Sequence, residues 1–140
     1  MQKETNIVSS KLLKIKMPET KKEQLTEILQ NLRKIGDILG SSVISRDGLT
    51  IASDLAKDID EETFAAMSAA MQGAAETAVQ ELKQGNLNQI IIDAQKGKII
   101  TISAGEKAIL VILSKPSINL GLVLLELGRA SGKIANILIK

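Results

Sequence analysis

The sequence predicts an α+β fold in which one five-stranded antiparallel sheet carries helices on both of its faces. Segments of helical and strand periodicity follow one another in the order helix, two strands, helix, three strands, helix. The core is expected to be aliphatic, because 44% of the 140 residues are hydrophobic and Phe64 is the only aromatic one. This length is typical of a single domain that buries a core of its own.

The first helix is expected over residues 21–34. Thr20 followed by Glu23 is a capping-box pattern, which marks the start of a helix. Apolar residues then recur at helical spacing, and Gly36 ends the helix. Before it, residues 1–19 are polar and rich in lysine, and Pro18 breaks the chain. We expect residues 1–19 to form a flexible N-terminal extension and residues 20–140 to form one domain.

A hairpin follows, with strands over 38–45 and 49–54. Gly48 in the turn Arg46-Asp47-Gly48 can adopt the positive φ that a tight turn requires. Apolar and polar side chains alternate after the turn, which is the period of a half-buried strand. The hairpin therefore fixes the first two strands of the sheet.

The remaining elements are a long helix over 60–84, three strands and a final helix. Asp58 and Asp60 are candidate N-caps of the long helix, and Gly85 is expected to stop it. The other elements are expected at 87–94, 98–104, 107–113 and 119–138.

The composition argues against most kinds of chemistry. The chain has neither His nor Cys, so it lacks the usual general base, thiol nucleophiles and the common zinc ligands. We expect no enzyme, no catalytic residue, no cofactor-binding residue and no metal site. The scarcity of aromatic side chains argues against base stacking and hence against a nucleic-acid partner. No apolar run reaches the length of a membrane span, and the absence of Cys favours a cytoplasmic protein.

One segment superficially resembles a phosphate-binding loop. Gly128-Arg129-Ala130-Ser131-Gly132-Lys133 has three residues between its glycines where the motif needs four, and Ile134 replaces the Ser or Thr that binds magnesium. It also falls inside a predicted helix. We interpret Gly121 and Gly128 instead as packing contacts of that helix.

The long helix has two kinds of surface. One apolar stripe is expected to cover the sheet; it comprises Phe64, Met67, Met71, Ala74, Ala75, Ala78 and Leu82. Small residues occupy much of the remainder, and Gly73 among them lowers helix propensity. Such a surface lets another backbone approach closely. If the strand over 87–94 lies at the sheet edge, its unpaired backbone groups invite a strand from another chain. The predicted dimer interface comprises Ala66, Ala69, Ala70, Gly73, Thr77, Gln89, Ile90, Ile91 and Ile92.

These features together resemble the Roadblock (dynein light chain) family in its prokaryotic form. The resemblance rests on the order of elements, on Val43-Ile44-Ser45-Arg46-Asp47-Gly48-Leu49, on the small-residue second helix, and on Asn119-Leu120-Gly121-Leu122-Val123. It covers residues 20–138. It implies a sheet with one helix on one face and two on the other, and a dimer formed through the second helix and the third strand.

The resemblance also implies a function. Members of that family have no catalytic centre and act as scaffolds and regulators, often beside Ras-like small GTPases. The expected partners are thus a second copy or a paralogous Roadblock protein, and a Ras-like small GTPase. Arg46 and Asp47 are candidate contacts for a partner. The alternatives are a small-molecule sensor, or a structural subunit of a larger assembly without a GTPase.

Overall fold

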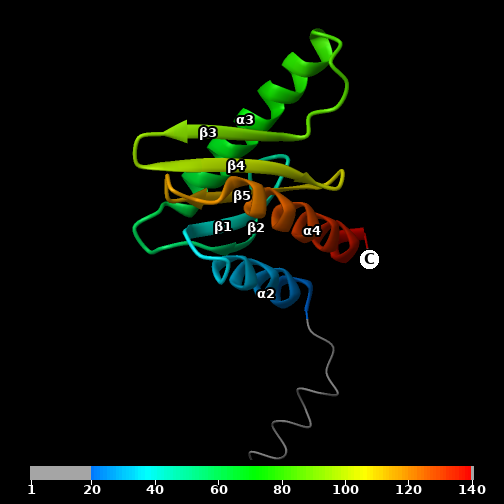
Figure 1. Cartoon of the computed structure of the whole chain (residues 1–140). Helices are drawn as coiled ribbons and strands as arrows, with labels where there is room; N and C mark the ends of the chain where they lie inside the picture. The colour runs from blue at the N-terminus through cyan, green and yellow to red at the C-terminus, as the bar shows by residue number, and fades with distance from the viewer. Residues whose placement is uncertain (1–19, 140) are drawn as a thin grey trace, which may run out of the picture.

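A five-stranded antiparallel sheet with helices on both faces makes up the computed structural model, which describes residues 20–139 (Figure 1). The elements are α2 (Lys21–Arg33), β1 (Ile38–Ser45), β2 (Thr50–Asp54), α3 (Glu61–Glu81), β3 (Gln89–Ala94), β4 (Gly97–Ala104), β5 (Ala108–Ser114) and α4 (Leu120–Ile139). The strands are ordered β2-β1-β5-β4-β3. The predicted fold class and order of elements are confirmed, whereas the expected flexibility of residues 1–19 lies outside the described residues.

Two layers of side chains flank the sheet. Leu110 and Ile112 of β5 pack with α2 and α4, while Ile109 and Val111 face α3. The apolar cluster on the side of α2 and α4 contains sixteen buried residues, and the cluster on the side of α3 contains four. Most of the hydrophobic stabilisation therefore comes from the two-helix face. The arrangement of one helix on one face and two on the other is as the resemblance implied.

The helices begin where the sequence indicated. The Thr20 hydroxyl accepts a hydrogen bond from the Glu23 amide at 3.1 Å, and the Asn119 side chain accepts one from the Leu122 amide at 3.2 Å. Each bond satisfies a backbone N–H that has no partner within its helix. The apolar face predicted for the last helix packs into the core through residues such as Val123, Leu127 and Ile134.

Helix α3 ends earlier than predicted. Its last helical residue is Glu81 rather than residue 84. Lys83 adopts a left-handed conformation with φ of 58°, and the Gln84 amide reaches back to the Val79 carbonyl at 2.9 Å. This C-terminal turn closes the helix two residues before Gly85. The prediction missed it because Lys is an uncommon residue at positive φ.

The glycines of α4 do not have the packing role that we predicted for them. A Cβ atom added at Gly128 would meet no atom within 4 Å, and one at Gly121 would meet only the Asn119 side chain. Both glycines are exposed to solvent. The segment that resembles a phosphate-binding loop lies within α4, so its backbone N–H groups are not arranged around an anion.

The N-cap of α3 leads to a prediction about the stability of the protein in acid. The Thr63 hydroxyl donates to the Asp60 carboxylate at 2.8 Å, and this bond, with backbone amides of Thr63 and Glu62, holds the pKa of Asp60 below its usual value. The resulting stabilisation is present above the unfolded-state pKa and is lost as pH falls through the folded-state pKa. Asp60→Asn should lower stability at neutral pH, and its difference from wild type should shrink in acid. Denaturation between about pH 7 and about pH 2 measures this, and a constant difference would contradict it. Asp58→Asn is the control.

Candidate interaction surface

Strand β3 is an unpaired edge of the sheet. Within the described chain it pairs only with β4, and the register from Gln89 to Ala94 continues without a shift. Ile90 and Ile92 are half-buried and Ile91 is 38% exposed. A regular apolar edge such as this can pair with a strand of another molecule.

The opposite edge is a poorer template. Strand β2 has five residues, and its pairing with β1 shifts register between Val43 and Ile44. Short strands and bulges are the usual means by which a sheet edge is made unsuitable for further pairing. The two edges thus differ, and β3 is the one that favours association.

The exposed face of α3 lies close to this edge strand in the chain. Ala70, Gly73 and Thr77 are all exposed, and a Cβ atom added at Gly73 would meet nothing within 4 Å. A glycine inside a helix costs about 1 kcal/mol relative to alanine. Nothing in the described chain uses the space that Gly73 leaves, so this part of the helix can admit another backbone.

Ala66 and Ala69 have a different role from the other predicted interface residues. Gly48 in the hairpin turn has φ of 88°, and a Cβ atom there would lie 3.2 Å from the Ala66 Cα and 3.6 Å from the Ala69 Cβ. The small residues in the first half of α3 therefore admit the hairpin of the same chain. Only the second half of the small-residue surface is without a neighbour in the described structure.

The apolar stripe expected to cover the sheet lies partly in solvent. Met67 is 61% exposed and Leu82 is 69% exposed, and Ala74 and Ala78 are exposed as well. The fully buried residues of α3 are instead Ala65, Ser68 and Gln72. Phe64 of the predicted stripe does pack against the sheet-side cluster. The rest of the prediction failed because most of this contact is made by small and polar side chains, which hydropathy does not distinguish from a solvated face. Their spacing of three and four residues was the only available signal.

Arg46 links three parts of the fold. Its guanidinium donates to the Glu106 carbonyl at 2.7 Å, to the Glu76 carboxylate at 2.5 Å and to the Ser103 hydroxyl at 2.5 Å. The β1–β2 hairpin is thereby joined to α3 and to the β4–β5 turn. Asp47, beside it, is exposed. Of the two candidate partner contacts, Asp47 is thus the more accessible, and Arg46 holds the surface in place.

Loss of the Arg46 contacts should loosen the hairpin. We expect Arg46→Gln to lower the free energy of unfolding by about 1–2 kcal/mol, since several charge-assisted hydrogen bonds are removed at a partly exposed site. Chemical denaturation measures this effect. Arg129→Gln is the control, because Arg129 is exposed and makes one pair with Glu126 on the same helix. An equal effect of both substitutions would show that Arg46 is an ordinary surface cation.

A polar cavity of about 460 Å³ lies between α3, the loop before β3 and the β4–β5 turn. Gln72 lines it although that residue is only 1% exposed. The Gln72 carbonyl oxygen accepts from the Thr101 hydroxyl at 2.7 Å, which leaves the amide NH₂ group for another acceptor. Sequence reasoning missed this group because nothing marks a buried glutamine within an alanine-rich helix. The lining residues are Arg46, Gln72, Glu76, Gln80, Gly85, Asn86, Leu87, Ser103, Gly105 and Glu106.

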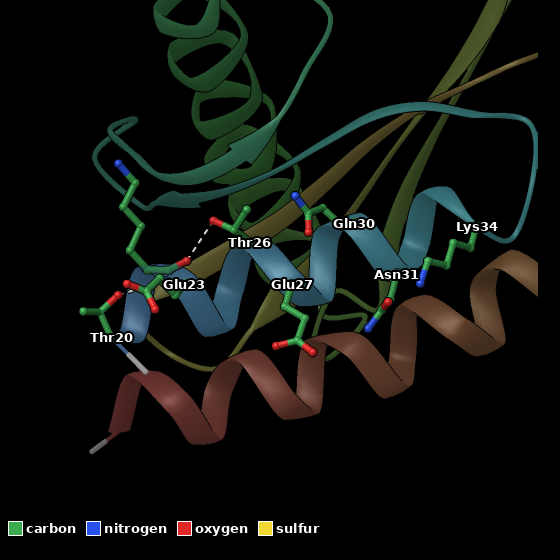
Figure 2. Close-up of a pocket in the computed structure, with 8 residues that line it drawn as sticks. Thr20, Glu23, Thr26, Glu27, Gln30, Asn31 and Lys34 are labelled. Atoms are coloured by element: carbon green, nitrogen blue, oxygen red, sulfur yellow. Dashed lines mark hydrogen bonds between the residues drawn. The ribbon is translucent and has the colours of Figure 1, made fainter. Parts of the chain in front are cut away.

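A second hollow, of about 680 Å³, lies over the outer side of α2 (Figure 2). Its lining residues all belong to one short segment between Thr20 and Lys34. Thr20 and Thr26 there make local hydrogen bonds to the Glu23 amide and the Lys22 carbonyl. Because no second element contributes to the lining, we assign this hollow no role.

The family model for the Roadblock/LC7 domain matches residues 24–114. The chain belongs to the Roadblock/LC7 family. The uncharacterized protein MJ0310 of Methanocaldococcus jannaschii is 41% identical over 110 residues, which cover 79% of this chain and 96% of that relative.

Two solved structures show that this Roadblock/LC7 domain shares its fold with MglB. MglB in a tetrameric arrangement has a TM-score of 0.79 at 22% identity, with 86% of this chain and 92% of that chain covered. The gliding protein MglB from Thermus thermophilus has a TM-score of 0.76 at 22% identity, with 86% and 93% covered. At this level of identity the comparison establishes the fold.

Among residues 20–139, no three acidic side chains come together in a way that could hold a metal ion. No helix of that range has the length and apolar character needed to cross a bilayer.

Proposed function

We propose that this Roadblock/LC7 domain is a non-enzymatic, dimeric regulatory module that binds or regulates a Ras-like small GTPase in the cytoplasm. The proposal rests on one observation. The exposed small-residue half of α3, from Ala70 to Ala78, leads through a short connection into the regular unpaired edge of β3. A helix and a strand of this kind form one surface that a second chain of the same fold can match.

The proposed dimer has a two-fold axis across β3. The β3 strands of the two copies pair, so the two sheets become one, and the second halves of the α3 helices meet over it. Both copies then use the same residues, as a two-fold interface requires. Gln89, Ile90, Ile91 and Ile92 supply the strand, and Ala70, Gly73 and Thr77 supply the helix. A paralogous Roadblock protein could take the place of the second copy.

The proposal of a GTPase partner rests on the family resemblance and on the surface beside the proposed dimer interface. The family resemblance implies regulatory members that act with Ras-like small GTPases. In this chain the β1–β2 turn presents the exposed Asp47, and Leu49 next to it is 69% exposed. The turn is held against α3 by Gly48 and Arg46. A partner that binds α3 would therefore also meet these two side chains.

The decisive test is binding to purified Ras-like small GTPases from the same source, loaded with GDP or with a non-hydrolysable GTP analogue. We expect one nucleotide state to be retained by the immobilised domain and the other to be washed away. Asp47→Lys with Leu49→Lys should abolish retention without changing the oligomeric state. If neither state is retained, the GTPase assignment is refuted. The dimer proposal is tested separately, by measurement of the oligomeric state.

A second candidate function is a small-molecule sensor, which the polar cavity beside α3 favours. Its volume and its free Gln72 amide suit a small ligand that offers a hydrogen-bond acceptor. A thermal-shift screen with small polar metabolites tests this. The Gln72→Leu variant should lose any stabilisation that a true ligand gives. No stabilising compound, or one that stabilises the variant equally, would eliminate the sensor.

A further inference from the structure

Strand β3 carries a polar side chain at each end of one of its faces. Ile91 lies opposite Ile100, which belongs to the apolar cluster on the side of α2 and α4. Since side chains alternate along a strand, Gln89 and Asp93 point to that side of the sheet as well. All three of these β3 side chains are exposed. This face of the edge strand therefore presents, in chain order, an amide, an isoleucine and a carboxylate.

The other face of β3 is apolar. Ile92 lies opposite Ile99, which packs with the cluster on the side of α3. Ile90 points to the same side, and Ile90 and Ile92 are both half-buried. A strand that pairs with this edge must therefore bring apolar side chains to the α3 side, and it must match an amide and a carboxylate on the other side.

A neighbour on β4 holds the Asp93 carboxylate in position. The Lys98 ammonium donates to Asp93 Oδ1 at 3.0 Å and to the Pro116 carbonyl at 3.1 Å. The Lys98 side chain is only 17% exposed, whereas the Asp93 side chain is 74% exposed. The ammonium thus fixes one side of the carboxylate, and the other side is accessible to a donor from another chain.

Symmetry limits how β3 can pair with a second copy of itself. Residues directly opposite in an antiparallel pair point to the same face, so the two-fold axis must pass between one residue and its own copy. With the axis at Ile91, the partner's Asp93 faces Gln89. The partner's Ile92 then faces Ile90 on the α3 side, and Ile91 meets its own copy. Every side chain of the pair is matched in polarity.

The neighbouring registers match less well. An axis at Ile90 sets Asp93 against the partner's Leu87, and an axis at Ile92 sets it against the partner's Ile91. An axis at Asp93 places two carboxylates opposite each other, which destabilises a strand pair. Burial of a carboxylate against an apolar side chain without a donor is costly too. Gln89 is the one side chain of β3 that can donate a hydrogen bond, and only the axis at Ile91 brings it to the carboxylate.

We propose that β3 pairs with the β3 strand of a second copy of this chain, with Ile91 on the two-fold axis and Gln89 donating to the partner's Asp93. This inference rests on the dimer proposed above, and it adds the register and the choice of a second copy as the partner. The contact forms twice, because each strand supplies both groups. Each amide meets a carboxylate whose other oxygen is already bonded to Lys98.

Distances between spin labels test the register, because the natural chain has no cysteine that would also be labelled. Asn88→Cys and Ala94→Cys, each labelled alone in the full-length protein, place an exposed label three residues to either side of Ile91. The proposed register gives both labels the same separation from their copies, about 20 Å along the strands. An axis at Ile90 gives about 14 Å for Asn88 and about 27 Å for Ala94, and an axis at Ile92 gives the reverse.

Pulsed electron paramagnetic resonance measures these separations, and its possible results distinguish the register from the dimer. Equal distances for the two labels support the proposed register. Two well-defined but unequal distances would overturn the register and leave the dimer intact. The absence of an intermolecular distance for both labels would refute the dimer together with its register.

An exchange of the two polar side chains gives a second test. Gln89→Glu sets a carboxylate against the partner's Asp93 at two places, so we expect the dimer dissociation constant to rise about tenfold. Addition of Asp93→Gln restores an amide opposite each carboxylate and should bring the constant back to within about threefold of the wild-type value. Sedimentation equilibrium measures both changes.

Gln95→Glu is the matched control for this exchange. It adds the same charge in the turn after β3, outside the paired strand, and should leave the dissociation constant unchanged. If Asp93→Gln does not relieve the effect of Gln89→Glu, or if the control weakens the dimer equally, Gln89 does not face the partner's Asp93 and the proposal is wrong.

Discussion

Gly73→Glu is expected to convert the dimer into a folded monomer. In the proposed interface the two Gly73 positions approach each other across the two-fold axis, so two carboxylates would be forced into a space that now holds no side chain. Like charges placed together at an interface cost several kcal/mol. The dimer dissociation constant should rise at least about 100-fold, which corresponds to roughly 2.7 kcal/mol. Sedimentation equilibrium and light scattering measure it.

Gly132→Glu is the matched control for this experiment. Gly132 is also exposed in the interior of a helix, and a Cβ atom there would likewise meet nothing within 4 Å. It lies on α4, away from α3 and β3. This variant should remain a dimer, and its circular dichroism should match that of Gly73→Glu. If Gly73→Glu is still dimeric, or if both variants dissociate, the α3 surface is not the interface.

Gly97→Ala should destabilise the fold by about 2–3 kcal/mol, as overpacking of a tight site does. A Cβ atom at this position would lie 2.6 Å from the Ser114 carbonyl oxygen, which is backbone and is held by the pairing of β5 with its neighbours. No side-chain rotation relieves that contact, so β4 and β5 must move apart at their ends. Urea denaturation at a fixed protein concentration measures the change.

Gly128→Ala should instead raise the stability of the fold. Its Cβ meets no atom, and alanine favours a helix over glycine by about 1 kcal/mol. The two substitutions therefore compare a glycine that a close backbone contact requires with a glycine that no contact requires. A Gly97→Ala variant that is not destabilised would mean that the contact at Gly97 is relieved by a shift that the structure does not show. Destabilisation by Gly128→Ala would contradict the open space around that glycine.

The sequence was sufficient for the fold because its local signals agreed with one another. The Thr20 cap, the Gly48 turn and the alternating strands each marked an element that the structure contains. The sheet order itself was not readable, apart from the antiparallel hairpins. The end of α3 was misplaced because Lys83, a residue without special turn preference, takes the left-handed conformation that usually belongs to glycine.

The candidate interaction surface was predicted less completely. The small-residue composition of α3 and the apolar strand after it could be read directly. The role of Arg46 could not, because its partners Glu76 and Ser103 lie 30 and 57 residues away in the chain. The orientation of α3 was also inaccessible. Hydropathy placed Met67 and Leu82 against the sheet, whereas the tertiary contacts put Ser68 and Gln72 there.

The unequal division of the core has a consequence for how such a domain can evolve. The apolar cluster on the side of α3 contains four buried residues, one of them Ala65 of α3 itself, while the cluster on the side of α2 and α4 contains sixteen. Substitutions on its outer surface therefore alter recognition with little risk to folding. After gene duplication, the copies can acquire different partners by divergence of this one helix. We expect paralogues of this chain to differ most on the outside of α3 and least beneath α2 and α4, and a sequence comparison among them would show this directly.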